Sequence, residues 1–306
     1  MKNVLKILAV IGIVFLSLLC YRLYRYGPNF GVWILPPSPQ AYGKFAISRM
    51  EKLGLYAQGE KWDREEAKAI RQIKSAKTYK DTYDTLEKLV KVAGGKHSDF
   101  ISANKANEDV RENQLPQTKL VDSNILYLKV PTHTFGDSNN NRNYIKILDS
   151  ALAKENFKAV IVDLADNRGG NMMPMLSGLS RLLPNDTLFT FEDRDGNKRT
   201  VDLPEKIEKI KVPVALIIND QTASSAEMTA LAFQGLDNVK IFGKPSAGYT
   251  TCNTVVRLYD GALLQLTTGR VIARSGKVYE NQAIQPDVGT DDALTQAQSW
   301  LTQTLK

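Results

Sequence analysis

Residues 159–164 read AVIVDL and residues 212–218 read VPVALII, and these two unbroken apolar runs decide the fold. Runs of this kind are typical of strands that are buried on both faces of a sheet. The surrounding pattern alternates between expected strands (125–130, 239–242 and 263–266) and expected helices (144–153, 172–183, 228–233 and 291–301). Buried strands that alternate with helices predict an α/β core, which we assign to residues 106–306.

The chain before this core has a different pattern. Residues 27–40 (GPNFGVWILPPSPQ) are rich in glycine and proline, which predicts a connector without regular helix. Apolar residues then recur at helical spacing within 41–92, and Ala93, Gly94 and Gly95 end this region. We therefore expect a connector and a helical N-terminal subdomain at residues 27–105.

The first residues form a candidate membrane anchor. An uncharged run at 7–21 (ILAVIGIVFLSLLCY) lies between Lys6 and Arg22. It is shorter than the roughly 20 apolar residues of a spanning helix, but flanking lysine and arginine side chains can reach the membrane surface. The alternative, a cleaved signal peptide, needs small residues at a cleavage site, and none follows the apolar run. We expect a transmembrane signal anchor at residues 1–26, in a single-pass protein of the cell membrane whose folded part lies outside the cytoplasm.

Composition narrows the class of protein and of partner. The 306 residues are 43% hydrophobic and 24% charged, as in folded globular proteins. The net charge is +7, and residues 44–96 hold 13 basic and 8 acidic side chains, which fits an anionic membrane surface or simply a solvated helical face. No dense basic run is interleaved with aromatic residues, so we expect no nucleic-acid partner. No metal-ligand spacing is present, so we expect no metal or cofactor, and the oligomeric state stays open.

Two loops follow the buried strands, at 165–171 (ADNRGGN) and 219–227 (NDQTASSAE). The carboxyl ends of parallel strands meet at one edge of a sheet, where chemistry gathers. A serine at a helix start lies among unpaired backbone N–H groups at the positive end of the helix dipole, and a Gly-Gly turn can present another N–H without a Cβ in the way. Alone, the first feature predicts only a helix cap and the second only a tight turn. Together they predict a nucleophilic serine beside an oxyanion hole.

A nucleophilic serine needs a general base at neutral pH. The chain has two histidines, His97 in AGGKHSDF (93–100) and His133 in PTHTFG (131–136). From chemistry alone either could be the base, and a packing histidine is the ordinary interpretation of both.

Four segments in the right order carry a family resemblance. They are DLADNRGG (163–170), TASSAE (222–227), FGKPSAG (242–248) and YENQAIQPDV (279–288). Over about residues 37–301 the chain resembles the serine peptidases that include the C-terminal processing proteases and the tricorn protease core. Ala283 stands where that family usually has glycine. The resemblance implies an α/β fold with a crotonase/ClpP-like β-α core and peptidase activity.

The same resemblance implies roles for single residues. Ser224 is the expected nucleophile, and the N–H groups of Ser225 and of Gly169 or Gly170 form the expected oxyanion hole. Processing proteases have a lysine base 25 positions after the nucleophile, where this chain has Tyr249.

The tricorn-like branch uses a histidine and a late glutamate instead, which match His97 and Glu280, and Ser98 is the candidate for its second serine. Only about 25 residues separate His97 from the strand at 125–130, so we expect no inserted PDZ domain.

The sequence thus predicts a serine endopeptidase with a Ser-His-Glu site that acts on a peptide or protein substrate. Three alternatives stay open. One is a catalytically silent, peptide-binding envelope protein of the same fold. Another is an esterase that uses the same triad. The third is a crotonase-type acyl-CoA enzyme, which would need neither His97 nor a nucleophilic serine.

Overall fold

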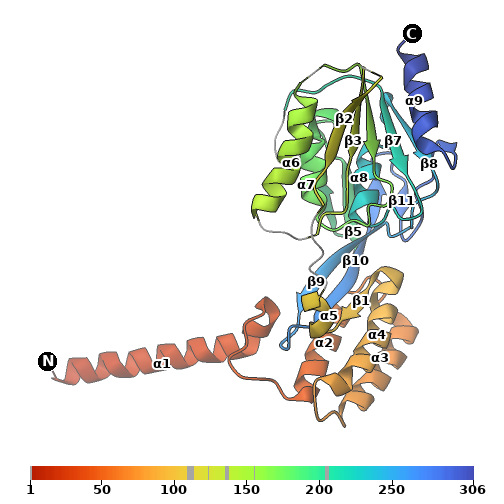
Figure 1. Ribbon diagram of the computed structural model, residues 1–306. Coiled ribbons are helices and arrows are strands. Elements are labelled where there is room, and N and C mark those ends of the chain that lie inside the picture. The colour runs from red at the N-terminus through yellow and green to blue at the C-terminus, as the bar shows by residue number, and fades with distance from the viewer. Residues whose placement is uncertain (1, 109–113, 123, 135–137, 155, 204–206) are drawn as a thin grey trace. The chain divides into compact units, whose positions relative to one another are not determined.

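The computed structural model describes residues 2–108, 114–122, 124–134, 138–154, 156–203 and 207–306 (Figure 1). The chain forms two compact units. The first unit is Met1–Val110 with Asn253–Thr267, and the second is Arg111–Cys252 with Thr268–Lys306. The chain therefore passes from one unit to the other three times. Two of these passages lie within strands, β9 (Thr251–Arg257) and β10 (Leu263–Ala273). Residues 253–267 lie within the segment predicted as the α/β core, 106–306, and are part of the first unit.

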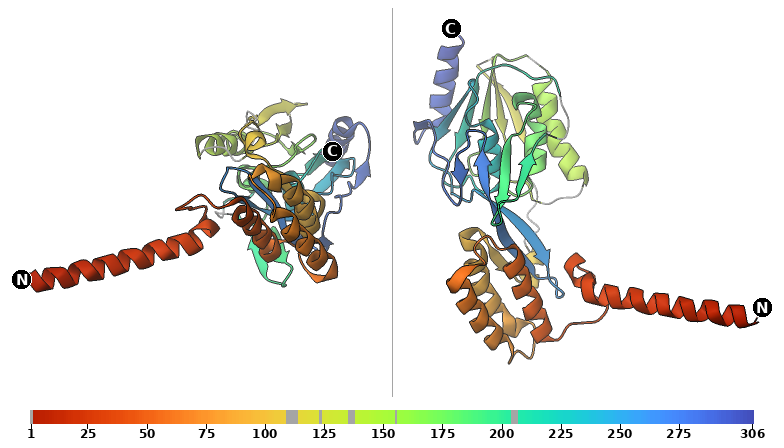
Figure 2. Two further views of the ribbon diagram at one scale, coloured as in Figure 1. Left: turned by 90° about the horizontal axis from the view of Figure 1, so that it is seen from below. Right: turned by 180° about the vertical axis from the view of Figure 1, so that it is seen from behind.

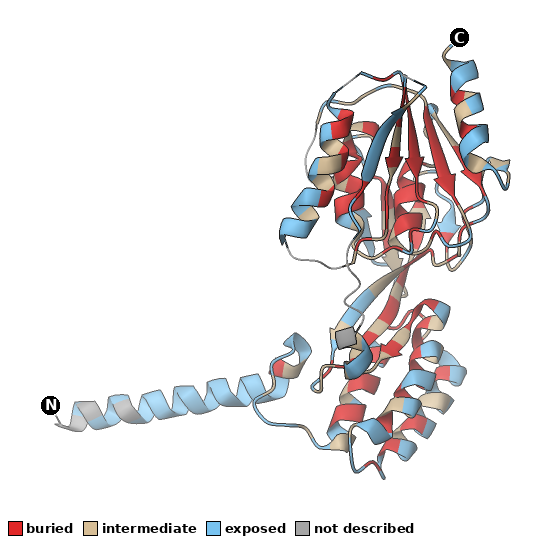
Figure 3. Cartoon of the chain, viewed as in Figure 1, coloured by how far each residue is buried: buried red, intermediate tan, exposed pale blue. Residues whose placement is uncertain are grey.

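The first unit begins with α1 (Lys2–Tyr26), a helix long and apolar enough to cross a membrane. Its described side chains are exposed along the helix (Figure 3). A 3-10 turn, η1 (Gly27–Phe30), follows it, and α2 begins at Pro39, inside the stretch predicted to be irregular. The Ser38 hydroxyl accepts a hydrogen bond from the Ala41 N–H, and proline suits the first turn of a helix, so the sequence does favour a helix start there.

The helices predicted within 41–92 are confirmed. The rest of the first unit consists of α2 (Pro39–Leu53), α3 (Gly59–Ile73), η2 (Lys80–Thr82), α4 (Tyr83–Gly94), η3 (Gly95–His97), β1 (Asp99–Ile101) and α5 (Ala103–Glu108). Residues 253–267, from β9 (Thr251–Arg257) and β10 (Leu263–Ala273), add Leu258, Leu264 and Leu266 to the helical core. The turn between them is fixed by Asp260, whose carboxylate accepts hydrogen bonds from the hydroxyls of Tyr42 at 3.1 Å and Tyr83 at 2.6 Å.

The second unit is built on a six-stranded sheet of order β12-β8-β7-β4-β3-β2. Figure 2 shows the ribbon from two further sides. Its strands are β2 (Gln117–Val121), β3 (Ile125–Lys129), β4 (Ala159–Asp163), β7 (Val214–Ile218), β8 (Val239–Gly243) and β12 (Val288–Gly289). All neighbouring pairs are parallel except β2 with β3. Every residue of β4 and β7 is buried, as their unbroken apolar sequences predict.

Helices cover both faces of this sheet. One face packs against α6 (Ser138–Leu152), α7 (Met172–Gly178) and α8 (Ser225–Phe233), and the other against α9 (Ala293–Thr304). Alternate residues of β4 divide between the two cores, with Val160 and Val162 on the first side and Ala159 and Ile161 on the second. The predicted α/β class is confirmed.

A second, antiparallel arrangement accompanies the main sheet. In the second unit, β10 pairs with β5 (Phe189–Asp193) and with β11 (Val278–Tyr279), and β5 pairs with β6 (Lys198–Val201). A short 3-10 turn, η4 (Ser180–Leu182), precedes this hairpin. Glu280 follows β11 directly, so this sheet positions the segment that carries the predicted glutamate.

Candidate active site

A strained turn carries Ser224. The residue lies between β7 and α8, and its backbone dihedral angles are φ +55° and ψ −119°. A residue other than glycine rarely adopts a positive φ, and such strain costs on the order of 1–3 kcal/mol. The nucleophilic serine of α/β-hydrolases occupies the same kind of sharp strand-to-helix turn, which exposes its hydroxyl. The strained backbone fits the predicted nucleophile, and the same turn also has the capping-box pairing of a helix start, in which the Glu227 side chain accepts from the Ser224 N–H.

A buried carboxylate supports this turn. Glu227, in the first turn of α8, has no exposed surface. Its Oε2 accepts hydrogen bonds from the backbone N–H groups of Ser224 and Tyr249, both at 2.8 Å, and its Oε1 accepts from the Gly248 N–H at 2.8 Å and from the Ser246 hydroxyl. Burial raises the pKa of Glu227, while the four hydrogen bonds oppose that rise. The carboxylate thus ties the Ser224 turn to the loop at 246–249.

Ser246 extends this network toward Glu280. The Ser246 hydroxyl accepts a hydrogen bond from the Ile284 N–H at 2.8 Å, and the Ser246 N–H donates to the Ile284 carbonyl at 3.0 Å. Glu280 itself is half-buried, four residues before Ile284. The segment that carries Glu280 is therefore linked to the Ser224 turn through two buried side chains.

Gly169 and Gly170 lie against the Ser224 turn. Both have positive φ, +93° and +108°. A Cβ on Gly169 would lie 2.9 Å from the Ser224 Cβ and 2.8 Å from the Ser225 nitrogen, so only glycine allows this approach. The Ser225 hydroxyl donates to the Gly170 carbonyl at 2.7 Å. The structure thus brings together Ser224 and all three residues predicted for the oxyanion hole.

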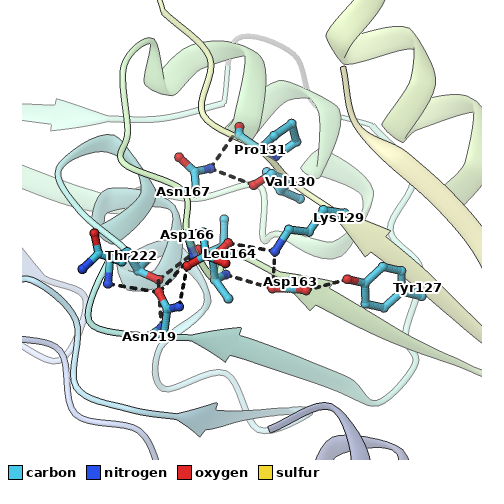
Figure 4. Close-up of polar contacts among 12 residues, drawn as sticks. Tyr127, Lys129, Val130, Pro131, Asp163, Leu164, Asp166, Asn167, Asn219 and Thr222 are labelled. Atoms are coloured by element: carbon cyan, nitrogen blue, oxygen red, sulfur yellow. Dashed lines mark hydrogen bonds and ion pairs between the residues drawn. The ribbon is translucent and has the colours of Figure 1, made fainter. Parts of the chain in front are cut away.

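Asn167 shapes the glycine turn through its side-chain hydrogen bonds, and Figure 4 shows those to Val130 and Pro131. Its buried side chain donates from Nδ2 to the carbonyls of Val130 and Pro131, at 2.8 and 3.1 Å, and accepts at Oδ1 from the Gly169 N–H at 2.8 Å. The Gly169 N–H is therefore already engaged. Gly170 is the better of the two predicted donors, because its N–H is not used in the bridge that pairs it with His133.

His133 braces the other side of the glycine turn. Its N–H donates to the Gly169 carbonyl at 3.2 Å, and its carbonyl accepts from the Asn171 N–H. The fully buried imidazole places Nε2 2.7 Å from the Asn141 Oδ1 and packs on the Tyr144 ring, 4.5 Å between centroids. Both partners belong to α6. These contacts give His133 a packing role beside the glycine turn, and which of the two histidines is the base stays a prediction.

The two loops after β4 and β7 are joined by hydrogen bonds, as Figure 4 shows. The buried Thr222 hydroxyl donates to the Leu164 carbonyl at 2.9 Å. The Asn219 Nδ2 donates to the Asp166 carboxylate at 2.9 Å, and its Oδ1 accepts from the Asp166 N–H at 3.0 Å. These contacts fix the glycine turn and the serine turn side by side at the carboxyl edge of the sheet.

An ion pair supports the base of the first loop (Figure 4). The Asp163 carboxylate lies 3.1 Å from the Lys129 Nζ and accepts a hydrogen bond from the Tyr127 hydroxyl at 2.5 Å. Lys129 also donates to the Ala165 carbonyl at 2.8 Å. Burial and the nearby carboxylate raise the pKa of Tyr127, so this phenol stays protonated. Lys129 is thus engaged in structural contacts where the loop begins.

His97 and Ser98 belong to the first unit, whereas Ser224, Glu280 and the glycine turn belong to the second. His97 is buried, and its carbonyl accepts from the side-chain amides of Asn253 at 3.0 Å and Gln265 at 3.1 Å. The alignment of the three triad residues stays a prediction.

The Ser98 hydroxyl is engaged within the first unit. It accepts from the Thr267 N–H at 2.8 Å and lies 3.1 Å from the Thr267 Oγ1. This pairing ties η3 to β10. A catalytic role for Ser98 also stays a prediction.

Burial controls the charge of His97. Burial, together with the neighbouring ammonium groups of Lys96 and Lys91, lowers the pKa of the imidazole to about 4. The side chain is therefore neutral near pH 7, which is the form that a general base needs. Its protonated form is disfavoured unless a carboxylate compensates.

Sequence reasoning did not assign roles to two residues of this site, Glu227 and Asn167. Both are present in the motifs, but their hydrogen-bond partners lie in other loops. Glu227 is an ionisable residue within an otherwise apolar helix start. Because such a group is seldom fully buried without partners, its position could have predicted a buried hydrogen-bond network. Within the ranges that the structure describes, no group of three or more His, Cys, Asp or Glu residues could hold a metal ion.

Two bacterial proteins resemble this chain, one over its whole length and the other over part of it. The nisin-resistance protein of Lactococcus lactis subsp. lactis is 39% identical over 324 aligned residues, which cover 100% of this chain and 99% of that protein. The carboxy-terminal processing protease CtpA of Bacillus subtilis (strain 168) is 30% identical over 140 residues, 45% of this chain and 30% of that protein.

Solved structures of other proteins share the fold of this chain. A lipoprotein from Streptococcus agalactiae is 40% identical and superposes with a TM-score of 0.85, covering 89% of this chain and 99% of that one. The photosystem II D1 C-terminal processing protease, 14% identical, shares the fold with a TM-score of 0.63 over 84% of this chain and 94% of that one. The model of the peptidase family S41 matches residues 124–290, which include Ser224 and both loops. The chain belongs to peptidase family S41.

Proposed function

We propose that this protein is a serine peptidase of the cell envelope. The observation that carries the proposal is the strained Ser224 turn, packed against Gly169 and Gly170, in a chain of family S41. In the proposed mechanism the Ser224 hydroxyl attacks a peptide carbonyl while His97 takes its proton. The N–H groups of Ser225 and Gly170 stabilise the oxyanion, and His97 then protonates the leaving amine.

Glu280 is the proposed partner of His97. An imidazolium in that environment is disfavoured by burial and by two lysines, so the mechanism needs a carboxylate at the moment of proton transfer. Glu280 would fix the imidazole tautomer and stabilise the cation, as the aspartate does in the Ser-His-Asp triad. Ser98 would act beside His97 only if its hydroxyl leaves Thr267.

The proposed substrate is a peptide such as nisin. The support is the similarity to the nisin-resistance protein of Lactococcus lactis, which extends over 100% of this chain and 99% of that protein. The remaining expectations join the proposal: an anchor at 1–26, a helical subdomain at 27–105, and a crotonase/ClpP-like catalytic core at 106–306. An anchor or signal at the N-terminus fits the envelope, and the domain would lie outside the cytoplasm.

A silent peptide-binding protein is the second candidate, and one observation favours it. Burial and the lysines next to His97 oppose the positive charge that a general base must carry during turnover. If no carboxylate compensates, the same loops would bind a peptide carbonyl without cleaving it.

The test uses the full chain in detergent or membranes. A fluorophosphonate probe should label one serine, and mass spectrometry should place the adduct on Ser224. The same preparation should cleave nisin, and Ser224→Ala should lower cleavage by roughly 10⁴-fold or more while the unfolding temperature stays nearly unchanged.

Equal labelling or cleavage by the Ser224→Ala protein would remove Ser224 from the mechanism. Binding of nisin without turnover would favour the silent candidate. Turnover of ester substrates with intact peptides would indicate an esterase.

A further inference from the structure

A second apolar surface follows α1. We name residues 26–35 (YGPNFGVWIL) the connector loop. Its exposed fractions are unusually high for large apolar side chains: Phe30 82%, Leu35 62%, Tyr26 57%, Val32 48% and Ile34 45% (Figure 3). Contiguous exposed apolar side chains of this kind mark a contact with a protein or a membrane.

The connector loop is closed by a backbone hydrogen bond within its turn and is attached to the helical unit by ring contacts of Trp33. The Val32 N–H donates to the Gly27 carbonyl at 2.9 Å, which closes the turn after η1. The Trp33 ring packs edge-on against Phe45, 5.0 Å between centroids, and against Tyr259 at 5.8 Å. One aromatic side chain therefore attaches the loop to the helical unit while its apolar neighbours stay in solvent.

The length of the apolar run in α1 indicates what covers these side chains. Its 15 uncharged residues (7–21) rise about 22 Å as a helix, whereas the hydrocarbon core of a bilayer is about 30 Å thick. The uncharged run alone does not fill that thickness, so the residues beside it in the 25-residue helix α1 take part in the span. The next residues suit this position, because Arg22 and Arg25 can extend to the headgroups and Tyr21, Tyr24 and Tyr26 resemble an aromatic belt.

We propose that the connector loop lies in the interfacial region of the same bilayer that α1 spans. A lipid surface then covers Phe30, Val32, Ile34 and Leu35. The inference rests on the proposed membrane anchor and is independent of the proposed catalysis. Through Trp33, Phe45 and Tyr259 the loop would hold the helical unit at the membrane surface instead of leaving it on a free tether.

The experiment places a reporter in the loop of the full chain. Phe30→Trp is reconstituted in phosphatidylcholine vesicles, with and without lipid brominated near the headgroup end of the acyl chains. The matched control is Leu294→Trp, at a 39% exposed position in α9 of the second unit. The added emission of Phe30→Trp should be quenched by bromine and shifted to shorter wavelength, whereas that of Leu294→Trp should not be.

A further variant separates docking from mere proximity to the anchor. Val32→Asp with Leu35→Asp, in the Phe30→Trp background, should abolish the quenching while the protein still resists carbonate extraction. Neither residue belongs to the proposed catalytic machinery, so labelling of Ser224 should stay unchanged and reports on folding.

Three results would overturn the inference. The first is the absence of quenching in Phe30→Trp, and the second is quenching that persists after both aspartate substitutions. The third is a wavelength shift that depends on the protein-to-lipid ratio without bromine quenching, which would indicate a second protein molecule as the partner. Loss of Ser224 labelling in every protein, with quenching intact, would count against the proposed function alone.

Discussion

The two halves of the proposed site are stabilised by different forces. The Ser224 half lies within one unit, where Glu227 and Asn167 join its loops through buried hydrogen bonds. The His97 half lies in the other unit, where burial and two lysines determine its charge. The proposed nucleophile is thus positioned by buried hydrogen bonds, whereas the charge of the proposed base is controlled by the electrostatic cost of protonation. Substitutions that disturb packing and hydrogen bonds should therefore affect the Ser224 half, whereas changes of pH should affect the His97 half.

Apart from removal of the Ser224 hydroxyl itself, the largest effect should come from filling the space beside Ser224. In Gly169→Ala the new Cβ would lie 2.7 Å from the Ala223 carbonyl oxygen and 2.9 Å from the Ser224 Cβ, and backbone atoms cannot give way cheaply. We expect turnover to fall about 10²–10³-fold, as after loss of one oxyanion donor. The matched control is Gly276→Ala, which has a similar positive φ of +82° but open space around it. Equal effects of the two substitutions would mean that backbone strain alone is responsible.

A slightly smaller effect should follow from Glu227→Gln. All four partners donate to the carboxylate and three of them are backbone N–H groups, so the amide NH₂ of glutamine would face at least one backbone N–H whichever way it turns. Each buried donor left without an acceptor costs about 1–3 kcal/mol. We expect a lower free energy of unfolding and slower phosphonate labelling of Ser224. The exposed Glu60→Gln serves as control, and unchanged labelling in Glu227→Gln would show that the serine turn does not need the charge.

The His97 half should respond to pH instead. Its pKa is lowered from 6.5 to about 4 on folding, so the folded state favours the neutral ring. The resulting stability is present above about pH 6.5 and is lost as pH falls through the folded value near 4. A shift of this size corresponds to at most about 3 kcal/mol. Unfolding free energies measured between pH 7 and 4 should fall more steeply for the native chain than for His97→Gln, and parallel curves would contradict the burial argument.

The smallest effect should come from Ser98→Ala. The hydroxyl exchanges hydrogen bonds with Thr267 in a fully buried position, so its loss should cost about 1–3 kcal/mol of stability. If Ser98 is structural only, kcat should change less than about threefold once the protein is folded. A drop in kcat near that of Ser224→Ala, with normal stability, would make Ser98 part of the chemistry.

The elements that were predictable from sequence are those whose signal is local. The apolar runs at 159–164 and 212–218 predict strands that are buried on both faces. The loops with Gly169-Gly170 and Ser224-Ser225 follow these strands in the sequence. Strands β5 and β6 were missed although Asp195-Gly196 marks a hairpin, because only Phe189, Phe191 and Val201 are buried and their partner β10 is about 80 residues away.

The unpredicted parts of the site are also non-local. In the sequence, Glu227 looks like an ordinary glutamate at a helix start, and only the fold shows that the loop at 246–249 donates hydrogen bonds to it. In the same way, Asn167 looks like a turn residue, and only the fold shows that its amide donates to the Val130 carbonyl. Nothing near Asp260 in sequence indicates that two tyrosines from α2 and α4 would meet it. Contacts of this kind depend on the topology and not on periodicity.

The late segment Asn253–Thr267 has a consequence for biosynthesis. The helical unit cannot complete its core until Leu258, Leu264 and Leu266 have been made, about 160 residues after Val110. At typical rates of about 5–20 residues per second, the first helices would wait on the order of ten seconds with their apolar faces uncovered. A chain cut between residues 252 and 267 should therefore depend on chaperones, even though it contains every helix of the helical unit from α2 to α5.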